Sequence, residues 1–199
     1  MATECTNMEL LNGQESFTLN GKETEIKTVD FWSYAFSNLM DKEDEIAEFL
    51  VATALGVKDP TNKLYWTLYD VLYRETRIEV KQTSYYHPWT NERSKTLRFD
   101  IAPRDGSNRE EPYCEPGLHR QNDIYVFCIV DGGSFEESYP LNLDAWTFYV
   151  VPTTVINRDF PETQKAVLAT SVKKNYADYA CKFDKLAERV NAIIDSTQK

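Results

Sequence analysis

Five short segments between residues 65 and 151 constrain the fold most, because each is rich in Val, Ile, Tyr and Phe. Such side chains fit the pleated, half-buried surface of a β-strand. Helical patterns precede and follow them, an order that favours an α/β fold with a mixed central sheet flanked by helices. The five predicted strands are Tyr65–Tyr73, Arg77–Thr83, Thr96–Ala102, Asp123–Val130 and Trp146–Val151.

Helical periodicity marks the regions on either side of these strands. Asp30 can cap a helical pattern over residues 31–56, which breaks near Asp41. The aromatic residues in its first part stand at helical spacing, which favours packing in a core over stacking on bases. A second pattern over residues 171–196 predicts a C-terminal helix. Ahead of both, Asn20-Gly21 between β-compatible flanks predicts a hairpin turn.

Length and composition indicate one domain over residues 16–199, preceded by a polar lead-in at residues 1–15. A chain of 199 residues with 42% hydrophobic content can bury a sizeable core. No apolar run approaches the ~20 residues that a membrane span needs, and the first residues lack the pattern of a secretion signal. The cysteines are scattered, with no CxxC pair. We therefore expect a cytoplasmic protein with reduced thiols and no membrane partner.

Two neighbouring predicted strands carry the residues that indicate chemistry. Alternate residues of a strand face the same side, so Glu79 and Lys81 project together. Asp70 lies on the preceding strand with eight residues between it and Glu79, and a turn near residues 73–76 would bring the two carboxylates together. Two carboxylates suit Mg²⁺, which takes waters and phosphate oxygens as further ligands. A lysine beside them would orient or deprotonate an attacking water, or neutralise charge in the transition state.

The Glu-x-Lys triplet is weak evidence by itself, since Glu25-Ile26-Lys27 has the same pattern. Two acidic residues upstream, Asp70 and the helical Glu48, distinguish the triplet at Glu79. The alternative is an exposed ion pair on a solvated sheet face, with no role in chemistry.

The net charge of −10 opposes binding to a polyanion, but the charge is unevenly spread. Residues 74–121 hold 9 Lys and Arg against 8 Asp and Glu. Three residues of this region are candidate substrate contacts: His87 and Arg93 in a long polar connection, and Arg120 ahead of the fourth predicted strand. An ion pair with Asp123 is the alternative for Arg120, and a loop histidine such as His87 can equally be incidental.

The chain resembles a group of uncharacterised bacterial proteins of the restriction-endonuclease-like PD-(D/E)xK nuclease superfamily, over about residues 22–195. The resemblance implies an αβββαβ core. Glu48 matches the acidic residue of the first core helix, and Asp70, Glu79 and Lys81 match the Asp, Asp/Glu and Lys of the motif; Tyr69 replaces the motif's proline. The likeness is carried, in order, by residues 30–37, 46–56, 78–81, 123–128 and 146–150.

The resemblance implies a Mg²⁺-dependent endonuclease, with Mn²⁺ able to replace Mg²⁺, that hydrolyses phosphodiester bonds of DNA in restriction or phage defence. Asp70 and Glu79 would bind the metal, Glu48 would assist directly or through water, and Lys81 would act on the nucleophile. Cleavage of both strands would favour a homodimer. The alternative is a non-catalytic domain of the same fold that binds a protein partner in a larger complex, which the acidic net charge favours.

Overall fold

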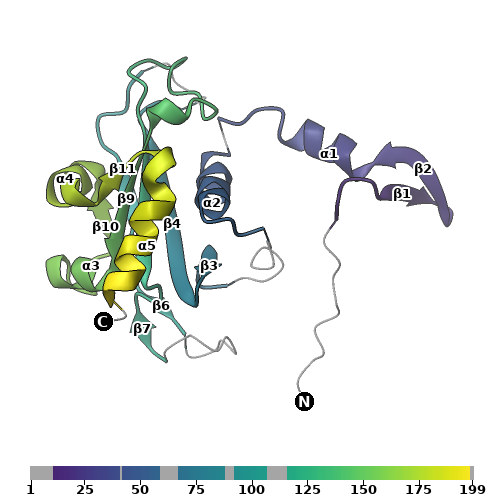
Figure 1. The fold of residues 1–199 in the computed structure, drawn as a ribbon. Helices are drawn as coiled ribbons and strands as arrows, with labels where there is room; N and C mark the ends of the chain where they lie inside the picture. Colours follow the sequence, from purple (N-terminus) through teal and green to yellow (C-terminus); the bar gives the residue numbers. More distant parts are fainter. Residues whose placement is uncertain (1–10, 41, 59–66, 88–91, 107–115, 198–199) are drawn as a thin grey trace. The chain divides into compact units, whose positions relative to one another are not determined.

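The computed structural model describes residues 11–40, 42–58, 67–87, 92–106 and 116–197. They belong to two compact units, residues 1–42 and 43–199, each of which is described by itself. The second unit contains a five-stranded mixed sheet packed against helices, which confirms the predicted α/β class (Figure 1). No helix in the described ranges combines the length and the apolar character needed to cross a bilayer.

The first unit begins with a β-hairpin. Strands β1 (Ser16–Leu19) and β2 (Lys22–Lys27) are antiparallel. Asn20 and Gly21 join them with φ angles of 52° and 74°, the left-handed conformation that tight hairpin turns require. The predicted turn is therefore confirmed.

Helix α1 (Thr28–Ala35) follows the hairpin and starts earlier than predicted. Asp30 lies inside its first turn, where its Oδ2 accepts a hydrogen bond from the backbone N–H of Lys27 at 2.7 Å. The prediction that the aromatic residues of this segment form a core is wrong, because three of them are exposed: Phe31, Tyr34 and Phe36. The eight residues of α1 have few neighbours in this unit against which to bury them.

The sheet of the second unit has the strand order β11-β9-β8-β4-β3. Strands β4 and β8 are parallel, with Ile78 opposite Ile124, and every other neighbouring pair is antiparallel. The predicted second, fourth and fifth strands are confirmed as β4, β8 and β9. The strands are β3 (Val71–Tyr73), β4 (Thr76–Ser84), β8 (Ile124–Val130), β9 (Trp146–Pro152) and β11 (Ala180–Cys181).

The first predicted strand is shorter than expected. Residues 67–70 form no strand, and residues 65 and 66 lie outside the described ranges. Asp70 therefore directly precedes β3 in a bend instead of lying on it. The predicted turn after β3 is confirmed: Arg74 and Glu75 have φ angles of 50° and 62°, which lets β4 return antiparallel to β3.

The third predicted strand and the C-terminal helix also differ from expectation. Only Arg98–Asp100 (β5) is a strand, and it pairs with β10 (Ala166–Leu168) outside the main sheet. The predicted long helix is interrupted between α4 (Ala169–Asn175) and α5 (Leu186–Thr197), because β11 joins the sheet edge there. The remaining short elements are α3 (Thr153–Asp159), β6 (Arg104–Asp105), β7 (Leu118–His119) and 3₁₀ turns at Leu143–Ala145, Ala177–Tyr179 and Phe183–Lys185.

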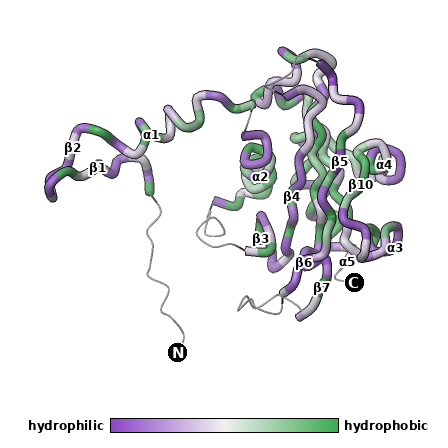
Figure 2. The backbone as a smooth tube through the Cα atoms, turned by 180° about the vertical axis from the view of Figure 1, so that it is seen from behind, coloured by the Kyte–Doolittle hydropathy of each residue, from purple (hydrophilic) through white to green (hydrophobic). Residues whose placement is uncertain are grey.

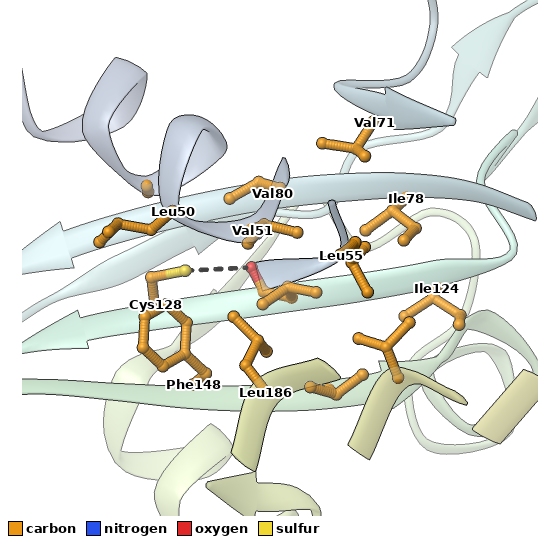
Figure 3. Packing of buried hydrophobic residues seen from close by; sticks show 14 of the residues in the cluster. Leu50, Val51, Leu55, Val71, Ile78, Val80, Ile124, Cys128, Phe148 and Leu186 are labelled. Carbon is orange, nitrogen blue, oxygen red and sulfur yellow. Dashed lines mark hydrogen bonds between the residues drawn. The ribbon is translucent and has the colours of Figure 1, made fainter. Parts of the chain in front are cut away.

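Two hydrophobic clusters lie on opposite faces of the sheet. On one face, α2 (Glu43–Ala54) and α5 pack against apolar side chains of β4, β8 and β9 (Figure 3). On the other face, the second cluster joins β8 and β9 to α3, α4, β5 and β10. Figure 2 shows α2 and the β5–β10 pair on opposite sides of β4.

Alternation along β4 assigns its residues to these two faces. Ile78 and Val80 are buried in the α2–α5 cluster. Glu79 and Lys81 consequently project to the other face, beside Tyr125 and Phe127 of the neighbouring β8. This arrangement confirms the predicted face for the two charged residues.

Candidate functional site

Glu79 and Lys81 form a close ion pair on β4, with 2.5 Å between Glu79 Oε1 and Lys81 Nζ. Their side chains are 16% and 27% exposed. An ion pair on a solvated face would be more open than this, so the structure does not favour the alternative of an incidental surface pair. Parallel pairing with β8 places Tyr125 directly beside Glu79, which shields one side of the pair from solvent.

Asp70 is fixed next to this pair by the backbone of β4. Its N–H donates to the carbonyl of Ile78 at 3.0 Å, and its Oδ2 accepts from the N–H of Val80 at 2.7 Å. The carboxylate thus lies at the edge of β4 where the short strand β3 has not yet begun. Asp70 is close enough to Glu79 to raise the pKa of its carboxyl group.

The charges of the three residues are interdependent. Burial raises the pKa of Glu79 above its ordinary value, Asp70 raises it further, and Lys81 opposes both. Burial alone would lower the pKa of Lys81, but the negative charges of Glu79, Asp70 and Asp100 outweigh it and the pKa is raised. Lys81 is therefore an ammonium ion at neutral pH.

Asn122 is a member of the site that the sequence did not reveal. This buried side chain donates from Nδ2 to Glu79 Oε2 at 2.7 Å and to the carbonyl of Leu68 at 2.8 Å. Two acceptors on one side determine which way the amide points. Asn122 directly precedes the Asp123–Val130 segment, and the parallel pairing of β8 with β4 brings it to Glu79. No motif in this sequence indicates that β4 and β8 are parallel neighbours.

Helix α2 contributes further acidic residues near Asp70 and Lys81. Asp44 lies within electrostatic range of Lys81 and Asp70. Glu48, one turn further along α2, is half-buried. Within the described residues, no three acidic, histidine or cysteine side chains come together in a group that would hold a metal ion. The structure therefore does not assemble Glu48, Asp70 and Glu79 as three direct metal ligands.

Two carboxylates are still sufficient for one kind of metal. Mg²⁺ commonly binds through one or two carboxylates and completes its shell with waters and substrate phosphate. Burial and, after it, the neighbouring Asp70 carboxylate raise the pKa of Glu79, and a bound cation would offset both effects. Asp70 and Glu79 thus supply two carboxylates of the kind that Mg²⁺ takes, whereas a complete protein cage is not present among the described residues.

Arg120 has a structural role that the sequence did not predict. It is 5% exposed, and its guanidinium donates to five acceptors at 2.6–3.2 Å. These bonds connect residue 101 to the end of α3 and occupy the whole guanidinium. The structure therefore does not support the expected phosphate contact. The alternative ion pair with Asp123 is also not observed: Asp123 pairs with Arg77 at 2.8 Å. The acceptors are Asn157 Oδ1 and the carbonyls of Ile101, Phe160, Pro161 and Gln164.

The two other predicted substrate contacts lie beyond the far end of β4. Arg93 stacks on the ring of Tyr85 at 3.6 Å and pairs with Asp131 at 2.6 Å. His87 is half-buried and belongs to a short β-bridge. Tyr85 shares the strand face of Glu79 and Lys81 but is four residues beyond Lys81. The structure therefore does not bring His87 or Arg93 into the group around Glu79.

Glu43, the first residue of α2, is a buried carboxyl group near the same edge. Its Oε2 accepts from Gln82 Nε2 at 3.0 Å, while Oε1 is enclosed without a hydrogen-bond partner among the described residues. Burial raises its pKa from 4.5 to about 7. The folded protein therefore retains a proton on Glu43 that the unfolded chain releases near pH 4.5.

We expect stability to fall as the pH rises through this interval. The folded state binds more protons than the unfolded state between the two pKa values, so the contribution of Glu43 is complete below about pH 4.5 and is lost as the pH passes about 7. Glu43→Gln keeps the side chain neutral. Its free energy of unfolding relative to wild type should increase by about 1–3 kcal/mol between about pH 5 and pH 8, measured by urea denaturation.

Glu45→Gln provides the control, because Glu45 is an exposed residue of the same helical turn. It should follow the wild-type pH profile. Parallel profiles for wild type and Glu43→Gln would contradict the assignment of the proton to Glu43.

A pocket of about 510 Å³ lies at the end of the sheet where β4 and β8 begin and β9 ends. Asn122 and Arg77 are among its lining residues, and α3 starts at its wall. Glu79 and Lys81 are not among them. Asn122 therefore contacts both the pocket and the Glu79 carboxylate.

No family model, curated protein or solved structure matches this chain.

Proposed function

We propose that the chain is a Mg²⁺-dependent nuclease of the PD-(D/E)xK type that hydrolyses phosphodiester bonds, with DNA as its substrate and the cytoplasm as its location. The observation that carries the proposal is the partly buried Glu79–Lys81 pair beside the Asp70 carboxylate at the edge of β4. The start of the element order supports it as well. Helix α2 precedes the β3–β4 hairpin as in the restriction-endonuclease-like αβββαβ core, but a 3₁₀ turn instead of an α-helix lies between β8 and β9.

Each side chain has a defined part in this proposal. Asp70 and Glu79 would hold the metal, and Glu48 on the neighbouring helix would assist through water. The metal, when bound, neutralises charge on the phosphate and lowers the pKa of an attacking water. Lys81 is an ammonium ion in this structure, so it orients the water and stabilises developing negative charge instead of removing a proton. Asn122 keeps Glu79 in place by donating to Oε2.

A protein-binding role is the second candidate, and the first unit favours it. Eight large apolar side chains with 41–83% exposure lie between residues 11 and 36. Exposed apolar residues concentrated in so short a segment are typical of a contact surface. This surface would bind a second copy of the nuclease or a partner in a larger complex. Its residues are Leu11, Phe17, Leu19, Ile26, Val29, Phe31, Tyr34 and Phe36.

Metal binding and cleavage together test the proposed nuclease. Wild-type protein should bind Mg²⁺ or Mn²⁺ in calorimetric titrations and should nick supercoiled plasmid when either ion is present. Glu79→Gln removes one ligand charge and should weaken metal binding at least about tenfold, with loss of nicking.

Glu25→Gln is the matched control, because Glu25 occupies the same Glu-x-Lys pattern on the exposed strand β2. It should bind metal and nick plasmid like wild type. A wild-type protein that binds neither ion and leaves DNA and RNA intact would refute the nuclease and leave the protein-binding role.

A further inference from the structure

The hairpin of the first unit has one polar and one apolar face. On the polar face, Lys27 Nζ donates to Ser16 Oγ at 2.7 Å, and Ser16 Oγ donates to Glu23 Oε2 at 3.3 Å. Side chains alternate between the two faces along β1 and β2. The apolar face therefore carries the three large apolar side chains of the hairpin: Phe17, Leu19 and Ile26.

Burial on these two faces is the reverse of the usual arrangement. Lys27, on the polar face, is half-buried. Phe17, Leu19 and Ile26, on the apolar face, are 48%, 67% and 57% exposed. A two-stranded hairpin is at best marginally stable and needs further strands or a helix packed on its apolar face. Helix α1 leaves all three side chains exposed, so the described residues of the first unit do not supply that layer.

The exposed apolar area of the first unit is large enough for a stable dimer. Eight large apolar side chains of this unit are 41–83% exposed, three on the hairpin and the others before it or on and after the start of α1. An aromatic side chain can bury about 150–250 Å² and an aliphatic one somewhat less, so the eight together leave on the order of 800 Å² exposed. Each partner of a standard protein interface contributes about 800 Å².

The distribution of charge favours a second copy as the partner. A chain with a net charge of −10 repels its own copies wherever their carboxylates meet. On the hairpin, alternation places Glu23 and Glu25 on the polar face, whereas Lys22, beside the turn, is the charged residue of the apolar face. Two copies can therefore join their apolar faces without bringing the carboxylates of the hairpins together.

The second unit has no comparable concentration of exposed apolar residues in its described part. Five large apolar side chains are exposed there, and they are dispersed over separate elements. They are Phe49 on α2, Leu118 on β7, Leu141 and Leu143 ahead of β9, and Leu168 on β10. The apolar surface of the first unit is therefore matched best by the same surface of another copy.

We propose that the eight exposed apolar residues of the first unit bind the same residues of a second copy, with the apolar faces of the two hairpins packed against each other. Such a contact uses one surface on both copies, so it has two-fold symmetry and is complete with two chains. Packed sheets bury their apolar sides in this way, about 10 Å apart. The inference goes beyond the proposed nuclease, since it holds whether or not the chain cleaves nucleic acid.

Sedimentation velocity on the full chain, without metal or nucleic acid, tests the dimer. Wild type should sediment at twice the mass of one chain, with a dissociation constant on the order of 10 µM or lower. Leu19→Glu places a charge on the apolar face and should raise that constant at least about tenfold. Leu19→Thr adds no charge and keeps a side chain that favours strands, and it should raise the constant at least about threefold.

Two variants are matched controls for Leu19→Glu. Thr18→Glu adds the same charge to the neighbouring exposed residue of β1, but on the polar face. Leu141→Glu replaces a leucine of the second unit that is 68% exposed, against 67% for Leu19. Both controls should dimerise like wild type.

Three results would overturn the inference. Wild type that remains monomeric at ~100 µM would leave the apolar surface to a different protein. Wild type that forms larger, open assemblies would exclude the two-fold contact. Leu19→Glu and Leu19→Thr that dimerise like wild type, or a control that dissociates as Leu19→Glu does, would remove the contact from the apolar face. Because sedimentation needs neither metal nor cleavage, it decides the dimer even when the nuclease assay fails.

Discussion

Lys81→Met is expected to lower the rate of Mg²⁺-dependent plasmid cleavage about a hundred- to a thousandfold. Methionine keeps most of the volume of lysine but removes the ammonium that lies 2.5 Å from Glu79 Oε1. Without that charge, the pKa of Glu79 rises further, because burial and Asp70 already raise it. The variant should therefore lose both the cation at the reacting phosphate and part of its metal affinity. Cleavage kinetics and a calorimetric metal titration measure the two effects separately.

The folded state of this variant must be verified, since the pair is partly buried. A shift of Tm by no more than about 10 °C, with an unchanged circular dichroism spectrum, would show that the loss of cleavage has a chemical origin. Lys27→Met changes the lysine of the other Glu-x-Lys triplet, on β2, and should cleave like wild type. Full cleavage by Lys81→Met would exclude Lys81 from the chemistry.

Arg120→Ala is expected to be the most destabilising of the substitutions considered. It leaves four backbone carbonyls and Asn157 Oδ1 without the buried guanidinium that they share. Loss of a buried charged donor with several acceptors costs about 3 kcal/mol or more. In a chain of this size the corresponding fall in Tm is about 6–12 °C. Thermal and urea denaturation measure it.

Arg158→Ala is the comparison, because the Arg158 side chain is 69% exposed and its partner is the adjacent Asp159. We expect a change of no more than about 0.5 kcal/mol. If Arg120→Ala instead retained the wild-type Tm and lost affinity for DNA, the phosphate contact predicted from the sequence would be correct and the structural role wrong.

Local patterns predicted those elements whose periodicity is strong and whose turns have specific chemistry. The turn at Asn20-Gly21 and strands β4, β8 and β9 belong to this class, because turn residues and continuous β-branched runs act over short distances. The helix predicted over residues 171–196 is interrupted for a non-local reason. Ala180 and Cys181 pair with the edge of β9, and this pairing outweighs the local helical preference.

The candidate site was predicted in part for the same physical reason. Strand alternation is sufficient to put Glu79 and Lys81 on one face, and a short hairpin is sufficient to bring Asp70 near them. Asn122 was missed because it reaches Glu79 through a parallel pairing across more than 40 residues of sequence, which no local signal encodes. The role of Arg120 was predicted wrongly because its acceptors are mostly backbone carbonyls. Every residue has such a carbonyl, so the sequence does not indicate which ones an arginine will bind.

The bend at Asp70 has a consequence for the state of the protein in solution. Strand β3 pairs only with residues 76–78 of β4. Among the described residues, no strand pairs with this edge of β4 from Val80 onward. An open edge is where sheets of different molecules join and aggregate. The Asp70 carboxylate occupies the Val80 N–H at 2.7 Å, and an intruding strand would have to displace it and approach its negative charge. The residue proposed to bind metal therefore also occupies a backbone donor that a joining strand would need.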